Sequence, residues 1–210
     1  MWPPEALAFL AELRENNSRE WFKANRHSYD EYLRTPAEEL ADRLSHLGEP
    51  HFFRPFRDAR FHRGAPIRED VAVAIMPGSG SAYYFRLALD GLMLGAGIHE
   101  ARPDQLERFR AAILDDRRAR AFETAVAGAA RTGFSATEPV LKRAPRGYPA
   151  DHPRADRLRM KSLTVFKRHG PGRWLHTPES DATVTAELES TTPIVEWLAD
   201  TVGPSSDRRG

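Results

Sequence analysis

The stretch from residue 52 to residue 98 most constrains the fold, because it breaks into short apolar runs with turn-forming residues between them. Pro, Gly and Ser occupy residues 77–81, and Asp90-Gly91 stands between two apolar runs, which is a strong signal for a two-residue hairpin. Such spacing predicts strands that pair with their neighbours along the chain. We therefore expect an antiparallel meander built from residues 52–61, 71–76, 82–89 and 92–98.

Helical patterns flank this meander. Leu7, Leu10 and Leu13 fall on one face of a helix over residues 4–14, and Asn17 with Glu20 has the capping-box spacing that begins the next helix. The same reasoning predicts a helix from Pro36 and another from Pro103, followed by a second helical stretch to about Arg131. The helix from Pro103 would turn Leu106, Phe109, Ile113 and Leu114 inward. We also expect a short helix after Pro153, a strand at 163–166 and helices over 184–188 and 192–202.

The order of these elements predicts an α+β fold with a single domain. Its mainly antiparallel sheet would carry N-terminal, central and C-terminal helices. The domain would span residues 4–203, and residues 204–210 would form a disordered tail.

Composition narrows the function classes. At 210 residues and 40% hydrophobic, the chain can bury a sizeable core, and a net charge of +1 gives no general attraction to nucleic acid or anionic membranes. Cysteine is absent, which excludes disulfides, thiolate metal sites and cysteine nucleophiles. No apolar stretch reaches the roughly 20 residues that cross a bilayer, and the start lacks a signal-peptide pattern. We expect a soluble cytoplasmic protein with no membrane partner.

Charge is unevenly distributed. The chain is arginine-rich, since only four of its 31 basic residues are lysines, and many basic residues gather in residues 142–168. Residues 175–206 contain no Lys or Arg but several Asp and Glu. The basic segment could bind nucleic acid. We favour the alternative that acidic C-terminal helices pack beside it and neutralise part of it, because its basic residues alternate with Pro and Leu.

Two segments, 54–61 and 142–162, each combine cations, a carboxylate and aromatic rings. Buried charges need partners, so the segments build either an internal ion-pair network or an anion site. In a strand, Asp58 and Arg60 would project from one face and Arg57 from the other. Asp58 could then fix one arginine while the second holds a carboxylate or phosphate.

The second segment offers a turn at Arg146-Gly147-Tyr148, where glycine permits close approach of a ligand. Asp151 is most simply the N-cap of the helix after Pro153. His152 could transfer protons near neutral pH, although a structural hydrogen bond is the commoner role for a histidine in this position. Lys161 could join the same cluster.

The chain also resembles a known family. Asn16-Asn17-x-Arg19-Glu20-Trp21-Phe22, Arg57-Asp58-x-Arg60-Phe61, Gly95-x-Gly97, Pro145-Arg146-Gly147-Tyr148 and Leu158-Arg159-Met160-Lys161-Ser162 match, in order, the signatures of domain-of-unknown-function family 2461. The resemblance covers nearly the whole chain and implies one mixed α/β domain with no established activity. The family usually has lysine and tyrosine where Ala65 and Ile67 stand here, so a function that needs those side chains would be altered.

Two function hypotheses follow. In the first, Arg57, Arg60, Arg146 and Lys161, oriented by Asp58, bind a small anionic or phosphorylated ligand with Tyr148 and His152 at the rim. If the site is catalytic, His152 or Asp58 would move protons. In the second, the same residues form an internal ion-pair scaffold in a non-enzymatic interaction domain. His62, His99 and His152 lack the spacing of a metal-ligand motif, and we expect no metal and no cofactor.

Overall fold

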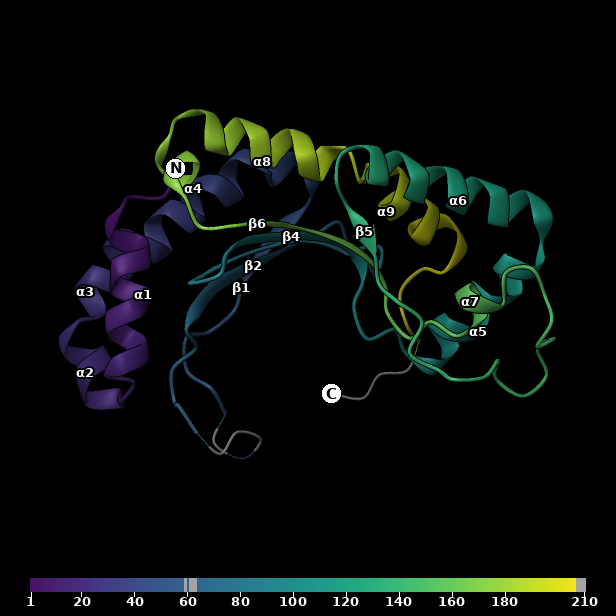
Figure 1. Ribbon diagram of the computed structural model, residues 1–210, viewed down its shortest axis with the longest axis horizontal. Helices are drawn as coiled ribbons and strands as arrows, with labels where there is room; N and C mark the ends of the chain where they lie inside the picture. The colour runs from purple at the N-terminus through teal and green to yellow at the C-terminus, as the bar shows by residue number, and fades with distance from the viewer. Residues whose placement is uncertain (59, 61–63, 207–210) are drawn as a thin grey trace. The chain divides into compact units, whose positions relative to one another are not determined.

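The computed structural model describes residues 1–58, 60 and 64–206. Its centre is a six-stranded antiparallel sheet with the strand order β1-β2-β3-β4-β6-β5 (Figure 1). The predicted α+β class and the antiparallel meander are confirmed. The strands are β1 (Glu49–Phe52), β2 (Asp70–Met76), β3 (Ala82–Ala88), β4 (Gly91–Ile98), β5 (Ser135–Ala136) and β6 (Leu163–His169).

Helices precede, interrupt and follow these strands. They are α1 (Glu5–Glu15), α2 (Arg19–Ala24), α3 (Arg26–Tyr29), a π-helical turn (Asp30–Arg34), α4 (Thr35–Arg43), α5 (Pro103–Leu114), α6 (Asp116–Arg131), α7 (Ala155–Leu158), α8 (Glu179–Glu189) and α9 (Thr192–Thr201). Within the described part of the chain, none of these helices has the length and apolar character needed to cross a membrane.

The chain divides into two compact units, each described here by itself. Unit 1 comprises Met1–Ile75, Tyr84–Leu94 and Arg168–Ala186. Unit 2 comprises Met76–Tyr83, Gly95–Lys167 and the chain from Glu187 onward. Several strands of the sheet contribute residues to both units.

In unit 1, α1 buries Ala6, Phe9, Leu10 and Leu13, while the predicted inward residue Leu7 is only half-buried. The predicted cap of the next helix is wrong by one residue, since the Ser18 hydroxyl, not Asn17, accepts the Trp21 amide at 3.1 Å. A serine directly before the first turn of a helix can cap that helix without any change in the backbone. Asn17 is thereby released for contacts with a distant segment.

The predicted strand over residues 52–61 is also wrong in extent. Strand β1 ends at Phe52, and beyond it, among the residues that the structure describes, Phe56 and Ile67 form an isolated antiparallel bridge. Prolines at 55 and 66 lack the amide hydrogen that a continuous ladder requires, which explains why pairing stops so soon. The predicted-strand residues Ala59 and Phe61 lie outside the described residues, as does His62.

In unit 2, α5, α6 and α9 pack against one another, and α6 also contacts β5 (Figure 1). Phe109 and Ile113 of α5 are buried as predicted. Leu114, predicted inward, is 39% exposed, whereas Gln105 is buried in its place. Leu114 is the last residue of α5. At this end the apolar face of the helix extends beyond the elements that cover it, so the side chain stays exposed.

Contacts in unit 2 continue past the predicted boundary at residue 203. The Asp104 carboxylate accepts hydrogen bonds from the Ser205 hydroxyl at 2.7 Å and the Ser206 amide at 2.9 Å. The Arg108 guanidinium donates to the Pro204 carbonyl at 2.9 Å. The described part of the predicted tail is therefore held by α5, and residues 207–210 lie outside the described residues.

Candidate functional site

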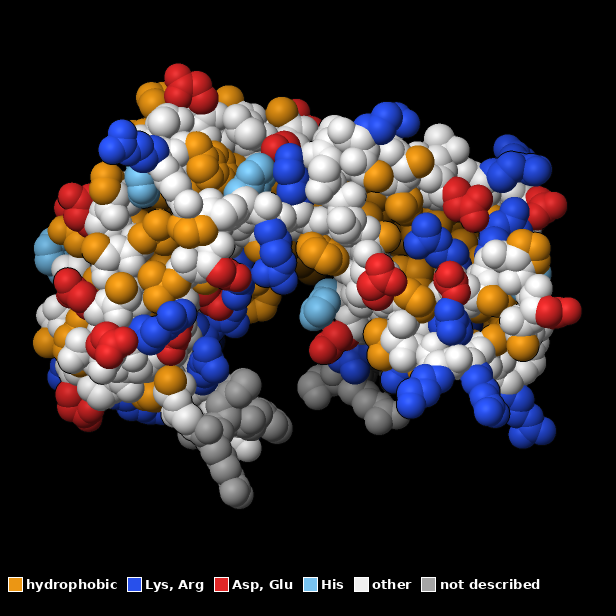
Figure 2. All heavy atoms as spheres, in the orientation of Figure 1, with side chains coloured by type: hydrophobic (Ala, Val, Ile, Leu, Met, Phe, Trp, Pro, Cys, Tyr) orange, Lys and Arg blue, Asp and Glu red, His pale blue; other side chains and the backbone are white. Residues whose placement is uncertain are grey.

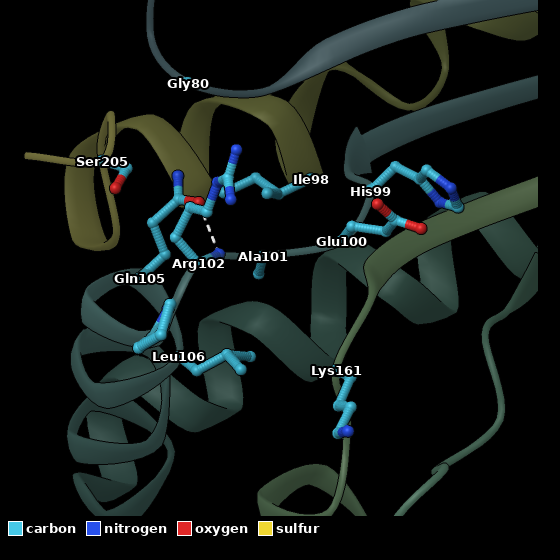
Figure 3. A pocket seen from close by; sticks show the side chains of 11 residues that line it. Gly80, Ile98, His99, Glu100, Ala101, Arg102, Gln105, Leu106, Lys161 and Ser205 are labelled. Atoms are coloured by element: carbon cyan, nitrogen blue, oxygen red, sulfur yellow. Dashed lines mark hydrogen bonds between the residues drawn. The ribbon is translucent and has the colours of Figure 1, made fainter. Parts of the chain in front are cut away.

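Unit 2 contains a hollow of about 730 Å³ beside the start of α5 (Figure 3). Four segments that lie far apart in the sequence line it. They are the β2–β3 loop at Gly80, the β4–α5 turn with the first turn of α5, the segment before β6 at Lys161 and the segment after α9. The larger lining side chains include His99, Glu100, Arg102, Gln105, Leu106 and Lys161. A hollow of this volume suits a small organic molecule.

Main-chain hydrogen bonds fix the turn that forms one wall of the hollow. The Ala101 amide donates to the Lys161 carbonyl at 3.1 Å, and the Arg102 amide donates to the Gln105 side chain at 3.1 Å. Gln105 in turn donates to the Gly203 carbonyl at 2.9 Å. This explains the burial of a polar residue in α5, because both ends of its amide are used.

Glu100 adopts a left-handed backbone conformation with φ of +52°. Non-glycine residues seldom adopt this conformation, and such strain is concentrated at functional sites. The turn thus places His99 and Glu100 together at the rim of the hollow, while Arg102 extends alongside Gln105 (Figure 3). Lys161 lies in the segment before β6, with its side chain directed away from Arg102 in this view.

The charges around the hollow do not cancel. Arg102 and Lys161 are exposed, and neither side chain has an ion-pair partner among the described residues. Glu100 is the one carboxylate among the residues that line the hollow. The hollow also has an apolar wall at Ile98 and Leu106. The hollow thus combines two basic side chains, one carboxylate and an apolar wall.

Lys161 is the predicted site residue that lines this hollow. Of the other three in unit 2, Arg146 is exposed in the irregular segment before α7. The ring of Tyr148 lies 5.9 Å from the Arg110 guanidinium. Burial lowers the pKa of Arg110, and Tyr148 partly offsets that effect.

The contacts of His152 are those of a structural residue. Its Nδ1 accepts the Arg154 amide at 3.1 Å, so Nδ1 carries no proton in this arrangement. The prediction that Asp151 caps the following helix is wrong, since the residue that precedes α7 is Arg154 and no side chain caps it. The His152 imidazole instead accepts the Arg154 amide, which the Asp151 carboxylate would have accepted as a helix cap.

The remaining predicted residues, Arg57, Asp58 and Arg60, belong to unit 1. Asp58 accepts from the Arg60 guanidinium at 2.6 Å and from the Arg60 amide at 2.9 Å. The prediction that they project from one face of a strand is wrong, because Asp58 folds back on Arg60 within a turn. The prediction that Asp58 orients an arginine agrees with this contact. Arg57 donates its own amide to the Pro66 carbonyl at 2.8 Å.

Sequence reasoning missed the turn residues Glu100 and Arg102 and the amide of Gln105. The available signal was a run of polar residues directly between an apolar strand and Pro103. Polar side chains at such a junction often face a ligand, because loops carry binding residues on a rigid scaffold.

Part of the basic segment at 142–168 is neutralised within unit 2. Lys167 pairs with Glu187 near the end of α8, which agrees with the expectation that the acidic C-terminal helices would do this. Arg154 pairs instead with Asp116 at 2.8 Å and Glu123 at 3.3 Å, both on α6. Lys and Arg side chains alternate with Asp and Glu over much of the face in Figure 2.

His, Asp and Glu side chains are the residues of this chain that could ligate a metal ion. In residues 1–58, 60 and 64–206, no three His, Asp or Glu side chains are grouped so that they could hold a metal ion. The titratable side chains that line the hollow are His99, Glu100, Arg102 and Lys161.

These features define a class of protein. It has an α+β fold with an open antiparallel sheet and a cationic hollow beside the start of a helix. Within that class, the chain belongs to the DUF2461 family, described as a conserved hypothetical protein, whose model matches residues 5–197. The family resemblance drawn from the sequence signatures is thus confirmed. No curated protein and no solved structure matches the chain.

Proposed function

We propose that the protein binds a small anionic ligand in the hollow of unit 2. Lys161 and Arg102 would pair with its carboxylate or phosphate group, and Ile98 with Leu106 would cover its apolar part. The observation that carries the proposal is that two cations without an ion-pair partner among the described residues line one hollow. Arg and Lys side chains bind such oxyanions through charge-assisted hydrogen bonds.

The first-turn amides of α5 support the same ligand class, because the start of a helix carries partial positive charge. Among the other predicted residues, Arg146, Tyr148 and His152 would act only if the ligand extends beyond the hollow. A catalytic role for His152 or Asp58 stays a prediction. Each of these side chains is engaged in a hydrogen bond that a proton transfer would disturb.

A thermal-shift panel tests the proposal. The purified chain is heated with small carboxylates and phosphate monoesters at constant ionic strength, next to the variants Lys161→Ala and Lys142→Ala. Lys142 is an exposed lysine that does not line the hollow, so it is the matched control. We expect equal stabilisation of the wild type and of Lys142→Ala, with a smaller stabilisation of Lys161→Ala. Equal responses of all three proteins would reject the hollow as the site.

A second function, that of a non-enzymatic interaction domain with an internal ion-pair scaffold, is favoured by a different observation. Asp58 is bound to Arg60, and Arg154 is bound to two carboxylates of α6. In that case Arg154→Ala lowers the thermal midpoint without affecting any response to anions. The same panel separates the two functions, because the scaffold predicts no stabilisation by any anion.

A further inference from the structure

Unit 1 contains a separate group of charged side chains on and beside the sheet, which we call the arginine cluster. It consists of Arg57, Arg68 and Arg86 with Asp70 and Tyr84. Only Arg57 was singled out in the sequence. The cluster goes beyond the proposed function, because it shares no residue with the hollow of unit 2.

The short ribbon around the Phe56–Ile67 bridge places two of the arginines on one face. The Arg57 amide donates to Pro66 at 2.8 Å, and the Arg68 amide donates to Pro55 at 2.7 Å. In an antiparallel pair, residues flanking a bridge project opposite to the bridged residues. Ile67 is fully buried on one side, so Arg57 and Arg68 share the other.

Asp70 links this ribbon to the sheet. Its carboxylate lies 2.7 Å from the Arg68 guanidinium and 3.9 Å from that of Arg86 on β3. Arg86 also pairs with Asp90 at 3.0 Å. These groups are largely withdrawn from solvent, with exposed side-chain fractions of 29% for Arg68, 13% for Asp70 and 23% for Arg86.

Tyr84 completes the wall. It follows the same face of β3 as Arg86, since the residues between them and on either side alternate between buried and half-buried. Burial raises the pKa of the Tyr84 hydroxyl, Asp70 raises it further, and Arg68 and Arg86 lower it. The Arg68 guanidinium lies 5.4 Å from the Phe53 ring centroid, which lends it an aromatic neighbour.

Two guanidinium nitrogens in this cluster are left without a partner. The Nε atoms of Arg57 and Arg86 are buried and have no hydrogen-bond acceptor among the described residues. Arg57 has no ion-pair partner among them either, while Asp70 is shared by two arginines. Buried polar groups in proteins are almost always hydrogen-bonded. The cluster therefore has an excess of donors and of positive charge.

We propose that the arginine cluster binds an oxyanion, carried by a small ligand as a phosphate or carboxylate group. The Nε–H groups of Arg57 and Arg86 donate to it, and Tyr84 lies beside it as a further donor. Guanidinium groups suit this role because their planar donors match the oxygens of both anions. The two chemistries differ in charge and shape, so they can be separated by titration.

The test titrates the full chain with inorganic phosphate and, separately, with acetate at constant ionic strength, using isothermal titration calorimetry. The variants are Arg57→Ala, Arg57→Lys and the control Arg54→Ala. Arg54 carries the same charge three residues earlier and is exposed. Loss of one charge-assisted hydrogen bond predicts affinity about tenfold weaker for Arg57→Ala, with Arg54→Ala unchanged. The anion that binds with the higher affinity identifies the oxyanion group, phosphate or carboxylate.

Arg57→Lys keeps the positive charge, so its affinity can be measured if Arg57→Ala fails to fold. It should also bind the anion more weakly than the wild type, because it lacks the Nε–H. Lys161→Ala should leave this binding intact, which separates it from the hollow. The proposal is overturned if the wild type binds neither anion, or if Arg54→Ala weakens binding as much as Arg57→Ala does. The second result would indicate general charge screening.

Discussion

The carboxamide of Asn17 closes a two-point clamp on the main chain of Ile67. Its Nδ2 donates to the Ile67 carbonyl at 3.0 Å, and its Oδ1 accepts the Ile67 amide at 3.0 Å. These two bonds join the segment before α2 to the ribbon that carries Arg57 and Arg68. An amide side chain is suited to this role, since it offers a donor and an acceptor in one plane.

Replacing Asn17 with alanine should lower the free energy of unfolding by about 1–3 kcal/mol, because the main-chain groups of buried Ile67 lose their partners. Urea unfolding monitored by tryptophan fluorescence measures the change. Asn16→Ala is the matched control, since Asn16 is exposed and its side chain donates to the Glu12 carbonyl in the adjacent helix. Equal losses in the two variants would contradict the clamp.

Gly97 should tolerate no side chain. Its φ is +124°, and a Cβ placed on it would lie 2.1 Å from the Leu163 carbonyl oxygen of β6. Gly97→Ala must therefore separate the two strands, and we expect a loss above about 3 kcal/mol, or failure to fold, from the combined clash and backbone strain.

Gly147 provides the comparison for Gly97, because its φ is also positive, at +90°, but nothing lies within 4 Å of its added Cβ. Gly147→Ala should cost only the backbone strain, about 1–2 kcal/mol. Thermal melts of the two variants measure the difference. A Gly97→Ala protein as stable as Gly147→Ala would show that β4 and β6 do not approach as closely as described.

Asp104 should make stability depend on pH in the acid range. Hydrogen bonds from Ser205 and Ser206, with a smaller effect of Arg108, hold the pKa of its carboxyl well below its usual range. A pKa depressed in the folded state adds stability above the pKa of the unfolded chain, near 3.9, and this is lost as pH falls through the folded value.

The variant Asp104→Asn tests this sign. The difference in thermal midpoint between wild type and Asp104→Asn should be largest near pH 6 and shrink as pH falls below about 4. Asp151→Asn, which alters an exposed carboxylate, should show no such trend. A difference that stays constant with pH, or grows in acid, would contradict the role given to Asp104.

Local patterns were enough to predict several of the regular elements. The Asp90-Gly91 turn, the helix beginning at Pro103 and the strand from Leu163 all occur where the sequence placed them. Each of these depends on contacts between near neighbours in the chain, which periodicity and turn chemistry report directly. The Ser18 cap was missed because Asn17, Ser18 and their neighbours are all competent caps, and a long-range bond to Ile67 decided between them.

The site residues were harder, because they depend on distant contacts. The sequence singled out Lys161 by its basic context, but nothing local indicated that it would line a hollow with Arg102 and Gly80. Asp58 was expected to fix one arginine and it contacts Arg60, yet two prolines ended the strand that was expected to hold both residues. Arg86 was not singled out from the sequence, because it is one charged residue within an apolar strand.

The central claim is that Lys161 and Arg102 bind an anion in the hollow of unit 2. The most direct measurement is a two-dimensional ¹H–¹⁵N spectrum of the protein titrated with butyrate and with phenyl phosphate, each a small anion with an apolar body. We predict saturable shifts of the amides of Glu100, Ala101, Arg102 and Lys161, retained in Lys142→Ala and lost in Lys161→Ala. Spectra without saturable shifts at these amides, or shifts that persist in Lys161→Ala, would contradict the account.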